Sequence, residues 1–305
     1  MAFSAADVKN LREMTGVGMM DCKKALAASD GDMDKAVEYL RERGLAASAK
    51  KAGRIAAEGM AYAAVINGVG VVVEVNAETD FVGKNEKFVD FVKGVAATVA
   101  SEAPKDLDAL MACKFNGGAE TVTQQQQEMV LVIGENIKVR RFARFADGVS
   151  VPYIHAGGKI GVLVNLDVEG EVSEKVVEAG KDMAMQIAAL NPRFLDKSQV
   201  TGDVLAEERK IMLAQMDNDP KMTGKPAQVK EKIVEGKLNK FYAENCLLQQ
   251  DFVKDNTMTV EQYVAAVAKA AGVKVTLKDA VRFEKGEGIE KKQEDFAAEI
   301  ASMIK

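Results

Sequence analysis

The segment GVVVEVN at residues 70–76 decides the fold that this sequence predicts, and it returns as GVLVNLD at residues 161–167. Both segments are rich in β-branched residues, which pack well on a pleated surface, so each predicts a β-strand. The two segments begin 91 residues apart, at Gly70 and Gly161. A similar strand that returns further along the chain indicates an internal repeat.

Each copy of the repeat continues in the same way. A helical stretch follows the strand, over residues 84–101 in the first copy and 173–190 in the second. Each copy then closes with a strand that ends in Arg-Phe, at residues 144–145 and 282–283. The closing strands lie 138 residues apart and the opening strands 91, so the second copy carries the difference of about 47 additional residues.

The additional residues predict two helices in succession, over residues 201–215 and 227–245, with Asn-Asp-Pro and Gly-Lys-Pro breaking the chain between them. Such a pair forms a projecting hairpin with an apolar stripe on each helix: Val204, Ile211 and Leu213 on the first, and Val229, Ile233, Leu238 and Phe241 on the second. A narrow projection needs a partner to bury such stripes. We therefore expect self-association through the hairpin, as a homodimer, or a contact with another protein.

The N-terminal segment predicts three short helices. Ser4, followed three residues later by Asp7, resembles a capping box, in which each side chain accepts a hydrogen bond from a backbone N–H at the helix start. Val8, Leu11 and Met14 fall on one face of this first helix.

The second helix is predicted over residues 19–28, after the break TGVG at 15–18. Asp32 caps the third helix, and Gly44 is predicted to end it, since glycine readily adopts the left-handed conformation of helix ends. Three helices in about 45 residues lie near the lower size limit for independent folding. We therefore expect this module to dock on another surface.

The sequence as a whole predicts an α+β protein. The expected parts are a three-helix module at residues 1–54, a sheet-and-helix subdomain at 55–146, a second subdomain at 147–288 with the hairpin inserted at about 201–245, and a C-terminal helix at 289–305. An alanine-rich helical linker is expected over residues 46–58, and its basic residues favour a solvated face over a phosphate or RNA contact.

Composition limits the classes of function. The chain has 305 residues, of which 48% are apolar and 29% charged, as expected for a folded globular protein. No apolar run reaches the roughly 18 residues of a membrane span, and no secretory signal opens the chain. The three cysteines, Cys22, Cys113 and Cys246, fit free thiols in a reducing compartment. We expect a cytoplasmic protein without membrane contact.

Charge and motifs favour a binding protein over an enzyme. The net charge is −5, and no dense basic stripe predicts a direct nucleic-acid contact. His155 is the single histidine, and neither Cys-x-x-Cys nor His-Glu-x-x-His occurs. The glycines at 16–18 match neither a dinucleotide fingerprint nor a phosphate loop. We therefore predict no catalytic residues, no metal site and no cofactor.

Six blocks in one collinear order resemble signatures of the elongation factor Ts family. They are VKNLREMTGVGMMDCKKAL at 8–26, EVNAETDFV at 74–82, IGENI at 133–137, YIH at 153–155, GKP at 224–226 with EKIVEG at 231–236, and RF at 282–283 leading to GEGIE at 286–290. One short block would be a weak signal, whereas six that extend along the whole chain are a specific one.

The resemblance implies a guanine-nucleotide exchange factor whose partner is the GTPase elongation factor Tu. It implies that the three-helix head is a ubiquitin-associated-like module that docks on the nucleotide-binding domain of the GTPase, through Arg12, Met19 and Met20. It further implies that the exchange factor promotes release of GDP without covalent chemistry of its own.

The resemblance also implies roles for two further groups of residues. The loop of Thr79, Asp80, Phe81 and Val82 is expected to help displace the magnesium ion that is bound with GDP. Ile133 and His155 are expected to make secondary contacts with the GTPase.

Each of these residues also has a purely structural interpretation. Pattern alone favours Phe81 as a core aromatic, Asp80 as the N-cap of the following helix, and His155 and Ile133 as packing residues. If these interpretations hold, the alternative function is a homodimeric scaffold whose head binds ubiquitin-like or peptide ligands. An enzyme is the third hypothesis, and no nucleophile, base and acid in the sequence form a recognisable set.

Overall fold

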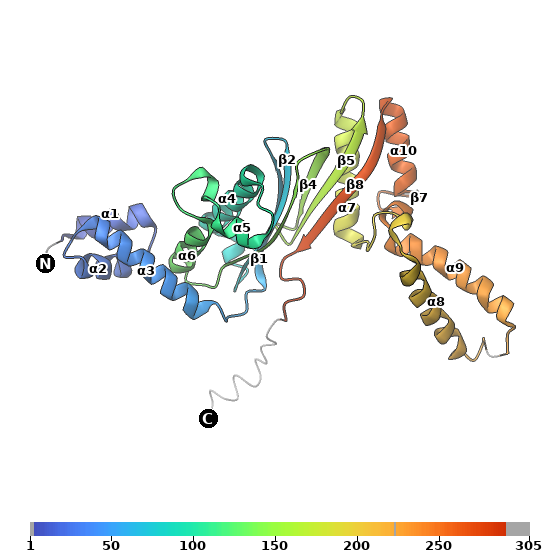
Figure 1. The fold of residues 1–305 in the computed structure, drawn as a ribbon, viewed down its shortest axis with the longest axis horizontal. Helices are drawn as coiled ribbons and strands as arrows, with labels where there is room; N and C mark the ends of the chain where they lie inside the picture. Colours follow the sequence, from blue (N-terminus) through green and yellow to red (C-terminus); the bar gives the residue numbers. More distant parts are fainter. Residues whose placement is uncertain (1–2, 223, 291–305) are drawn as a thin grey trace.

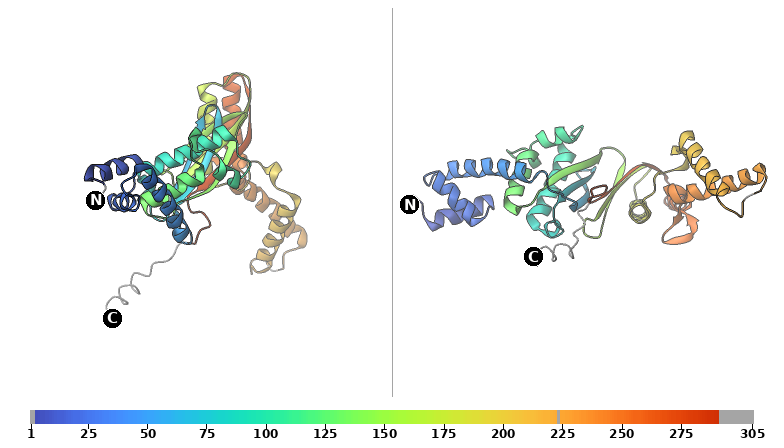
Figure 2. Two further views of the ribbon diagram at one scale, coloured as in Figure 1. Left: turned by 60° about the vertical axis from the view of Figure 1, so that its left-hand side comes forward. Right: turned by 90° about the horizontal axis from the view of Figure 1, so that it is seen from below.

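The computed structural model describes residues 3–222 and 224–290 as a mixed helix-and-sheet protein (Figure 1). Three N-terminal helices precede two three-stranded sheets, and a helical hairpin projects from the second sheet unit. Seen from below in Figure 2, the head and the hairpin lie at opposite ends of an elongated molecule. The predicted α+β class is confirmed, whereas the helix predicted over 291–305 lies outside the described residues.

The head consists of α1 (Ala5–Thr15), α2 (Met19–Ala28) and α3 (Met33–Lys51). The capping box is confirmed, because Ser4 and Asp7 accept hydrogen bonds from each other's backbone N–H. Asp32 caps α3 as predicted, by accepting the N–H of Lys35. The head has a core of its own, formed by Val8, Leu11, Val17, Cys22, Ala25, Leu26, Ala36 and Leu40.

The prediction that Gly44 ends the third helix is wrong. Helix α3 continues to Lys51 and takes up half of the expected linker, because Gly44 lies where α3 crosses α6 (Val122–Ile133). A Cβ at this position would lie 3.4 Å from the carbonyl oxygen of Gln127. The glycine therefore permits close packing of two helices.

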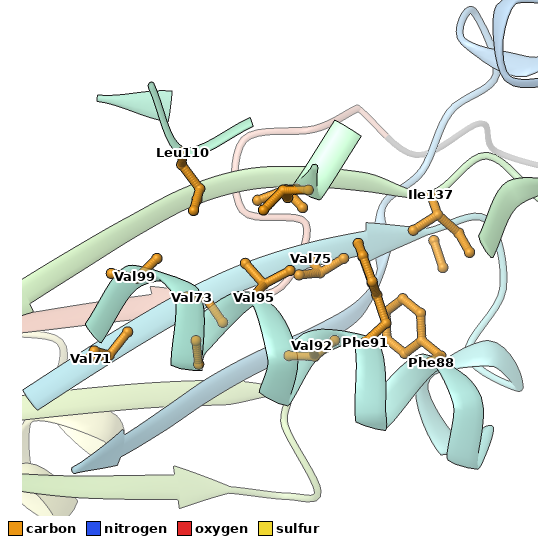
Figure 3. Packing of buried hydrophobic residues seen from close by; sticks show 14 of the residues in the cluster. Val71, Val73, Val75, Phe88, Phe91, Val92, Val95, Val99, Leu110 and Ile137 are labelled. Atoms are coloured by element: carbon orange, nitrogen blue, oxygen red, sulfur yellow. The ribbon is translucent and has the colours of Figure 1, made fainter. Parts of the chain in front are cut away.

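The two sheets confirm the internal repeat. The first has the antiparallel order β1 (Glu58–Ile66), β2 (Val69–Ala77), β3 (Lys138–Phe145), and the second has the order β4 (Val149–His155), β5 (Ile160–Glu169), β8 (Lys274–Glu284). Helix α4 (Glu86–Glu102) packs on the first sheet, and α7 (Glu174–Leu190) packs on the second. Figure 3 shows side chains of α4, including Phe88, Phe91 and Val95, directed at the valines of β2.

The repeat extends beyond the elements that the sequence analysis identified. Helix α6 and helix α10 (Val260–Ala271) both begin with a Thr-to-Gln capping box and both end at a left-handed glycine, Gly134 or Gly272. The two glycines are as far apart in the sequence as the two closing Arg-Phe pairs. Each subdomain is therefore a sheet covered by one helix after its central strand and another before its last.

The insertion forms the predicted hairpin of α8 (Gly202–Asp217) and α9 (Ala227–Asn245), with a short 3-10 turn and a small ladder of β6 (Asp251–Phe252) and β7 (Asp255–Thr259) after it. Most of its apolar residues pack between the two helices, including Leu213, Leu238 and Phe241. Ile211 and Val229 remain exposed. The hairpin therefore needs a partner less than its sequence suggested, and self-association through it stays a prediction.

The two sheets pack against each other through small side chains. The shared core contains Ala61, Ala63, Val72, Leu163 and Phe283. The close approach needs Gly161, where a Cβ would lie 3.3 Å from the Cβ of Ala61. The helices lie on the outer faces, so the subdomains form four layers, helix, sheet, sheet and helix (Figure 1).

A buried carboxylate joins the two sheets. Glu74 is fully buried at the register shift between β2 and β3, and it accepts hydrogen bonds from Arg140 at 2.9 Å, Arg141 at 2.5 Å and the backbone N–H of Gly286 at 2.8 Å. Asn76 donates a further hydrogen bond at 3.0 Å. Burial raises the pKa of Glu74, but these hydrogen bonds outweigh burial and the net pKa is lowered. Glu74 is therefore an ionised group whose partners come from both subdomains.

Replacement of this carboxylate should destabilise the protein. We expect Glu74→Gln to lower the free energy of unfolding by about 2–3 kcal/mol, because two arginines lose their buried counter-charge. The folded-state pKa of Glu74 lies below its ordinary value of about 4.3. The stability difference between the unchanged protein and Glu74→Gln should therefore be complete above about pH 4.3, and it should shrink as the pH falls through the folded-state pKa.

Urea unfolding of both proteins at pH 7 and at acidic pH measures this difference. The exposed Glu102, at the end of α4, provides the control, and Glu102→Gln should change stability by less than about 0.5 kcal/mol. Equal stability of Glu74→Gln and the unchanged protein at pH 7 would contradict the role of Glu74.

Candidate partner-binding site

The loop after β2 presents two side chains outward, those of Asp80 and Phe81. Phe81 is 79% exposed, whereas the next residue, Val82, is buried in the core of the first subdomain. The structural interpretation of Phe81 as a core aromatic is therefore wrong. A large apolar side chain held in water is costly, and it is a common feature of protein contact sites.

Asp80 does not cap the following helix. The N-cap of α4 is Asn85, whose side chain accepts the N–H of Lys87 and of Phe88. A turn of 3-10 helix, η1 (Val82–Lys84), separates Asp80 from this cap, which is why the interpretation from a simple strand-to-helix junction was wrong. Within residues 3–222 and 224–290, the exposed Asp80 carboxylate has no hydrogen bond or ion pair. It is available to an external cation or hydrogen-bond donor.

Packing fixes the base of this loop. Val82 is buried among the residues that contact α4, and Gly83 lies against β1. A Cβ at Gly83 would lie 2.9 Å from the carbonyl oxygen of Gly59, so a larger residue there would push the turn away from the strand. Val82 thus supports the loop from inside, whereas Asp80 and Phe81 form its outer surface.

A second segment binds the loop from the side. The carboxylate of Glu135 accepts the backbone N–H groups of Glu78 at 3.1 Å and Thr79 at 3.0 Å, and the Thr79 hydroxyl at 2.7 Å. In return, Glu78 accepts the backbone N–H of Asn136 at 2.6 Å. The sequence analysis placed Glu135 inside a matching block but assigned it no role. Glu135 and Thr79 belong to different blocks that lie far apart in the sequence, so no local signal indicated their proximity.

The secondary residues lie near the same end of β1. Ile133 is half-buried against the core at the end of α6, two residues before Glu135. His155 is exposed at the end of β4, and its Nδ1 lies 3.1 Å from the Tyr153 hydroxyl. The turn after His155 returns to β1, where the N–H of Ala61 donates to Gly158 at 2.8 Å. The structure therefore brings the loop of Thr79–Val82, Ile133 and the His155 turn around the first residues of β1.

The residues of the head that the resemblance assigns to docking are exposed. Arg12, Met19 and Met20 are all exposed, at the end of α1 and the start of α2. Met14, which falls on the same face of α1 as the buried Val8 and Leu11, is also exposed, because the first helix ends one residue later and the head core closes without it. Exposed methionines are typical of adaptable contact surfaces.

The remaining chemistry is sparse. Cys22, Cys113 and Cys246 are free, and burial raises the pKa of each thiol, so none of them is an activated nucleophile. Among the described residues, no group of three His, Cys, Asp or Glu side chains could hold a metal ion. In the same part of the chain, no helix is both long and apolar enough to cross a membrane.

Comparison with known proteins identifies the family of this chain. A family model described as Elongation factor TS matches residues 78–287. The chain is 52% identical to elongation factor Ts of Trichlorobacter lovleyi, over 99% of this chain and 98% of that protein. It is 47% identical to elongation factor Ts of Syntrophotalea carbinolica over the full length of both, and 47% identical to that of Clostridioides difficile over 99% of each. The chain belongs to the elongation factor Ts family of translation elongation factors.

Proposed function

We propose that this protein is a guanine-nucleotide exchange factor for the GTPase elongation factor Tu in the cytoplasm, and that the Asp80–Phe81 loop promotes release of GDP. The observation that carries the proposal is the outward position of Phe81, which is 79% exposed. Its loop is held by the hydrogen bonds of Glu135 on one side and by the packing of Gly83 against β1 on the other. No covalent step by this chain is needed, because exchange requires only binding.

Exchange requires that the factor bind the nucleotide-free GTPase more tightly than the GDP-bound form, since equal affinity for both forms would shift nothing. Phe81 contributes if its ring enters a pocket that opens only when GDP and magnesium leave. Burial of one phenylalanine side chain contributes about 1.5–3 kcal/mol, which corresponds to a factor of roughly 10 to 100 in an equilibrium.

Asp80 contributes through its charge. An unpaired carboxylate is a hard oxygen ligand of the kind that magnesium prefers, and its negative charge disfavours nearby phosphate groups. Both effects would weaken the binding of GDP and its magnesium ion to the GTPase. By linkage, nucleotide must weaken the binding of the exchange factor by the same factor, which allows the complex to separate once GTP binds.

The other exposed residues supply binding that does not depend on the loop. Arg12, Met19 and Met20 would dock the head on the nucleotide-binding domain, and His155, with Ile133 beside the loop, would add a second contact. The scaffold hypothesis is less well supported, because it requires Phe81 to be an ordinary packing residue, and the ring lies outside the core.

Truncation of Phe81 separates function from folding. We expect Phe81→Ala to lower the acceleration of GDP release from elongation factor Tu by about 10- to 100-fold, because the apolar contact is lost. Unfolding free energy should change by less than about 0.5 kcal/mol, since the ring has little contact with the core. Release of a fluorescent GDP analogue and urea unfolding measure the two quantities.

Val172→Ala is the matched control, because Val172 lies 91 residues after Phe81 at the same junction of the second repeat. It should leave both quantities unchanged. If Phe81→Ala exchanges GDP at the full rate, the loop mechanism is wrong; if the unchanged protein gives no acceleration, the proposed function is wrong.

Substitutions in the head should weaken the affinity of the factor for elongation factor Tu without changing the maximal rate of GDP release. We expect the double substitution Met19→Ala with Met20→Ala to raise the concentration of factor needed for half-maximal exchange by about 10-fold, because two exposed side chains lose apolar contact area. The maximal rate should be retained, since the loop is intact. Titration of exchange rate against factor concentration gives both values.

Leu45→Ala serves as the control, because Leu45 is a similarly exposed apolar residue on α3 of the same head. A reduced maximal rate in the double variant, at an unchanged half-maximal concentration, would place Met19 and Met20 in the exchange step itself.

A further inference from the structure

The internal repeat provides a natural comparison for the loop. The central strands β2 and β5 correspond at the offset that separates Gly70 from Gly161, and both have a register shift at the same place, after Glu74 and after Asn165. The segments from α6 to β3 and from α10 to β8 correspond at the larger offset that separates Gly134 from Gly272. The two offsets assign to Thr79 and Glu135 their counterparts in the second copy.

The counterparts have different chemistry. Thr79 corresponds to Gly170, and Glu135 corresponds to Val273. In the second copy these two residues pack directly, since a Cβ at Gly170 would lie 2.7 Å from Cγ1 of Val273. The second copy therefore closes this junction with Val273 in place of Glu135, next to the strand pair and ion pair of Glu169 and Lys274, so the carboxylate of Glu135 is not required for the architecture.

The loops that follow also differ. At the offset of the central strands, Glu86 at the start of α4 corresponds to Val177, whereas α7 already begins at Glu174. The first copy thus has three more residues in its junction, and these correspond in number to the η1 turn. Its outermost apolar side chain is Phe81, 79% exposed, and the counterpart Val172 is 43% exposed.

We propose that Glu135 is a positioning residue for exchange, which holds the Asp80–Phe81 loop in its outward conformation before the partner binds. This inference rests on the proposed function and names the group that prepares the loop. Glu135 accepts two backbone N–H groups and one hydroxyl from the residues directly before Asp80. These hydrogen bonds do not involve the side chains of Asp80 and Phe81, which remain exposed.

Glu78 adds further bonds between the base of the loop and the segment that follows α6. Its carboxylate accepts the N–H of Asn136 and lies 3.5 Å from the guanidinium group of Arg54. Asn136 also donates its side-chain N–H to the Arg54 carbonyl oxygen at 2.8 Å. Glu78 and Glu135 therefore bind each other's neighbouring backbone, and the base of the loop is anchored to the segment that follows α6.

Anchoring has a defined consequence for binding. A loop that is ordered only on contact loses conformational freedom at that moment, and the loss reduces affinity. A loop that is ordered beforehand avoids this cost. Removal of Glu135 should therefore weaken the contact that Phe81 makes, while the chemical groups of Asp80 and Phe81 remain in place.

The substitution Glu135→Val tests this, because valine is the residue that the second copy has at the same position. We expect the concentration of factor for half-maximal GDP release from elongation factor Tu to rise by about 10-fold. Amide hydrogen exchange of Glu78 and Thr79 should accelerate in the isolated factor. Glu102→Gln, an exposed substitution far from the loop in sequence, is the control and should behave as the unchanged protein in both measurements.

A double-mutant comparison shows whether Glu135 acts through Phe81. In a Phe81→Ala background, Glu135→Val should have little further effect on exchange, because the side chain that it positions is gone. A full additional loss of about 10-fold would overturn the proposal and make Glu135 a direct contact. Unchanged amide exchange in Glu135→Val, with an unchanged half-maximal concentration, would overturn it as well.

Failure of this inference can be told apart from failure of the proposed function. If the unchanged protein accelerates GDP release and Glu135→Val does so equally, only the positioning role is wrong. If the unchanged protein has no effect on GDP release, the exchange function itself is wrong. Glu135→Gln, which keeps the side-chain shape, serves as the second variant if Glu135→Val lowers the melting temperature.

Discussion

The buried carboxylate of Glu74 is the interaction on which the arrangement of the two subdomains depends. A charge without water must be paired, and its partners here come from β3 of the first sheet and from Gly286 after the last strand of the second. Arg141 also contacts the second subdomain directly, since it forms an ion pair with Glu287 and its guanidinium lies 4.3 Å from the centre of the Phe283 ring. Two blocks that resemble family signatures, around Glu74 and around Gly286, thus meet in one structural cluster between the sheets.

This rigid junction allows a short loop to be placed accurately. The loop of Thr79–Val82 follows β2, the strand that carries Glu74, and its base lies against β1 through Gly83. Glu74 ties β2 to the second subdomain and Gly83 contacts β1, so the position of Phe81 depends on few further bonds. The comparison between the copies shows which bonds are extra: the second copy has the corresponding three-stranded sheet and covering helices, but its junction is shorter and closes through Gly170 and Val273. The repeat thus contains one copy with a presented loop and one with a closed junction.

Elements with a strong periodic pattern were predictable, and local exceptions were not. The strands at 70–76 and 161–167, the helices after them and the hairpin helices all form as expected, because each helical pattern buries one face in a core and the two strands are buried almost throughout. Three local predictions were wrong for related physical reasons. Gly44 lies inside a helix, Phe81 lies outside the core and Asp80 leaves the capping role to Asn85, and in each case a contact with a distant segment or an additional turn outweighed the local preference.

The sequence by itself determined the repeat, the place of the insertion, the class of fold and the family resemblance, because these follow from spacing along the chain. The tertiary structure alone decided which members of the matching blocks are exposed. Val82 and Phe81 are adjacent apolar residues, yet one is buried and the other exposed. Val82 packs into the core of the first subdomain, and the loop around both residues contacts Glu135 and Gly59, which are distant from Phe81 in the sequence. Exposure is a property of packing between distant segments, and no local pattern contains it.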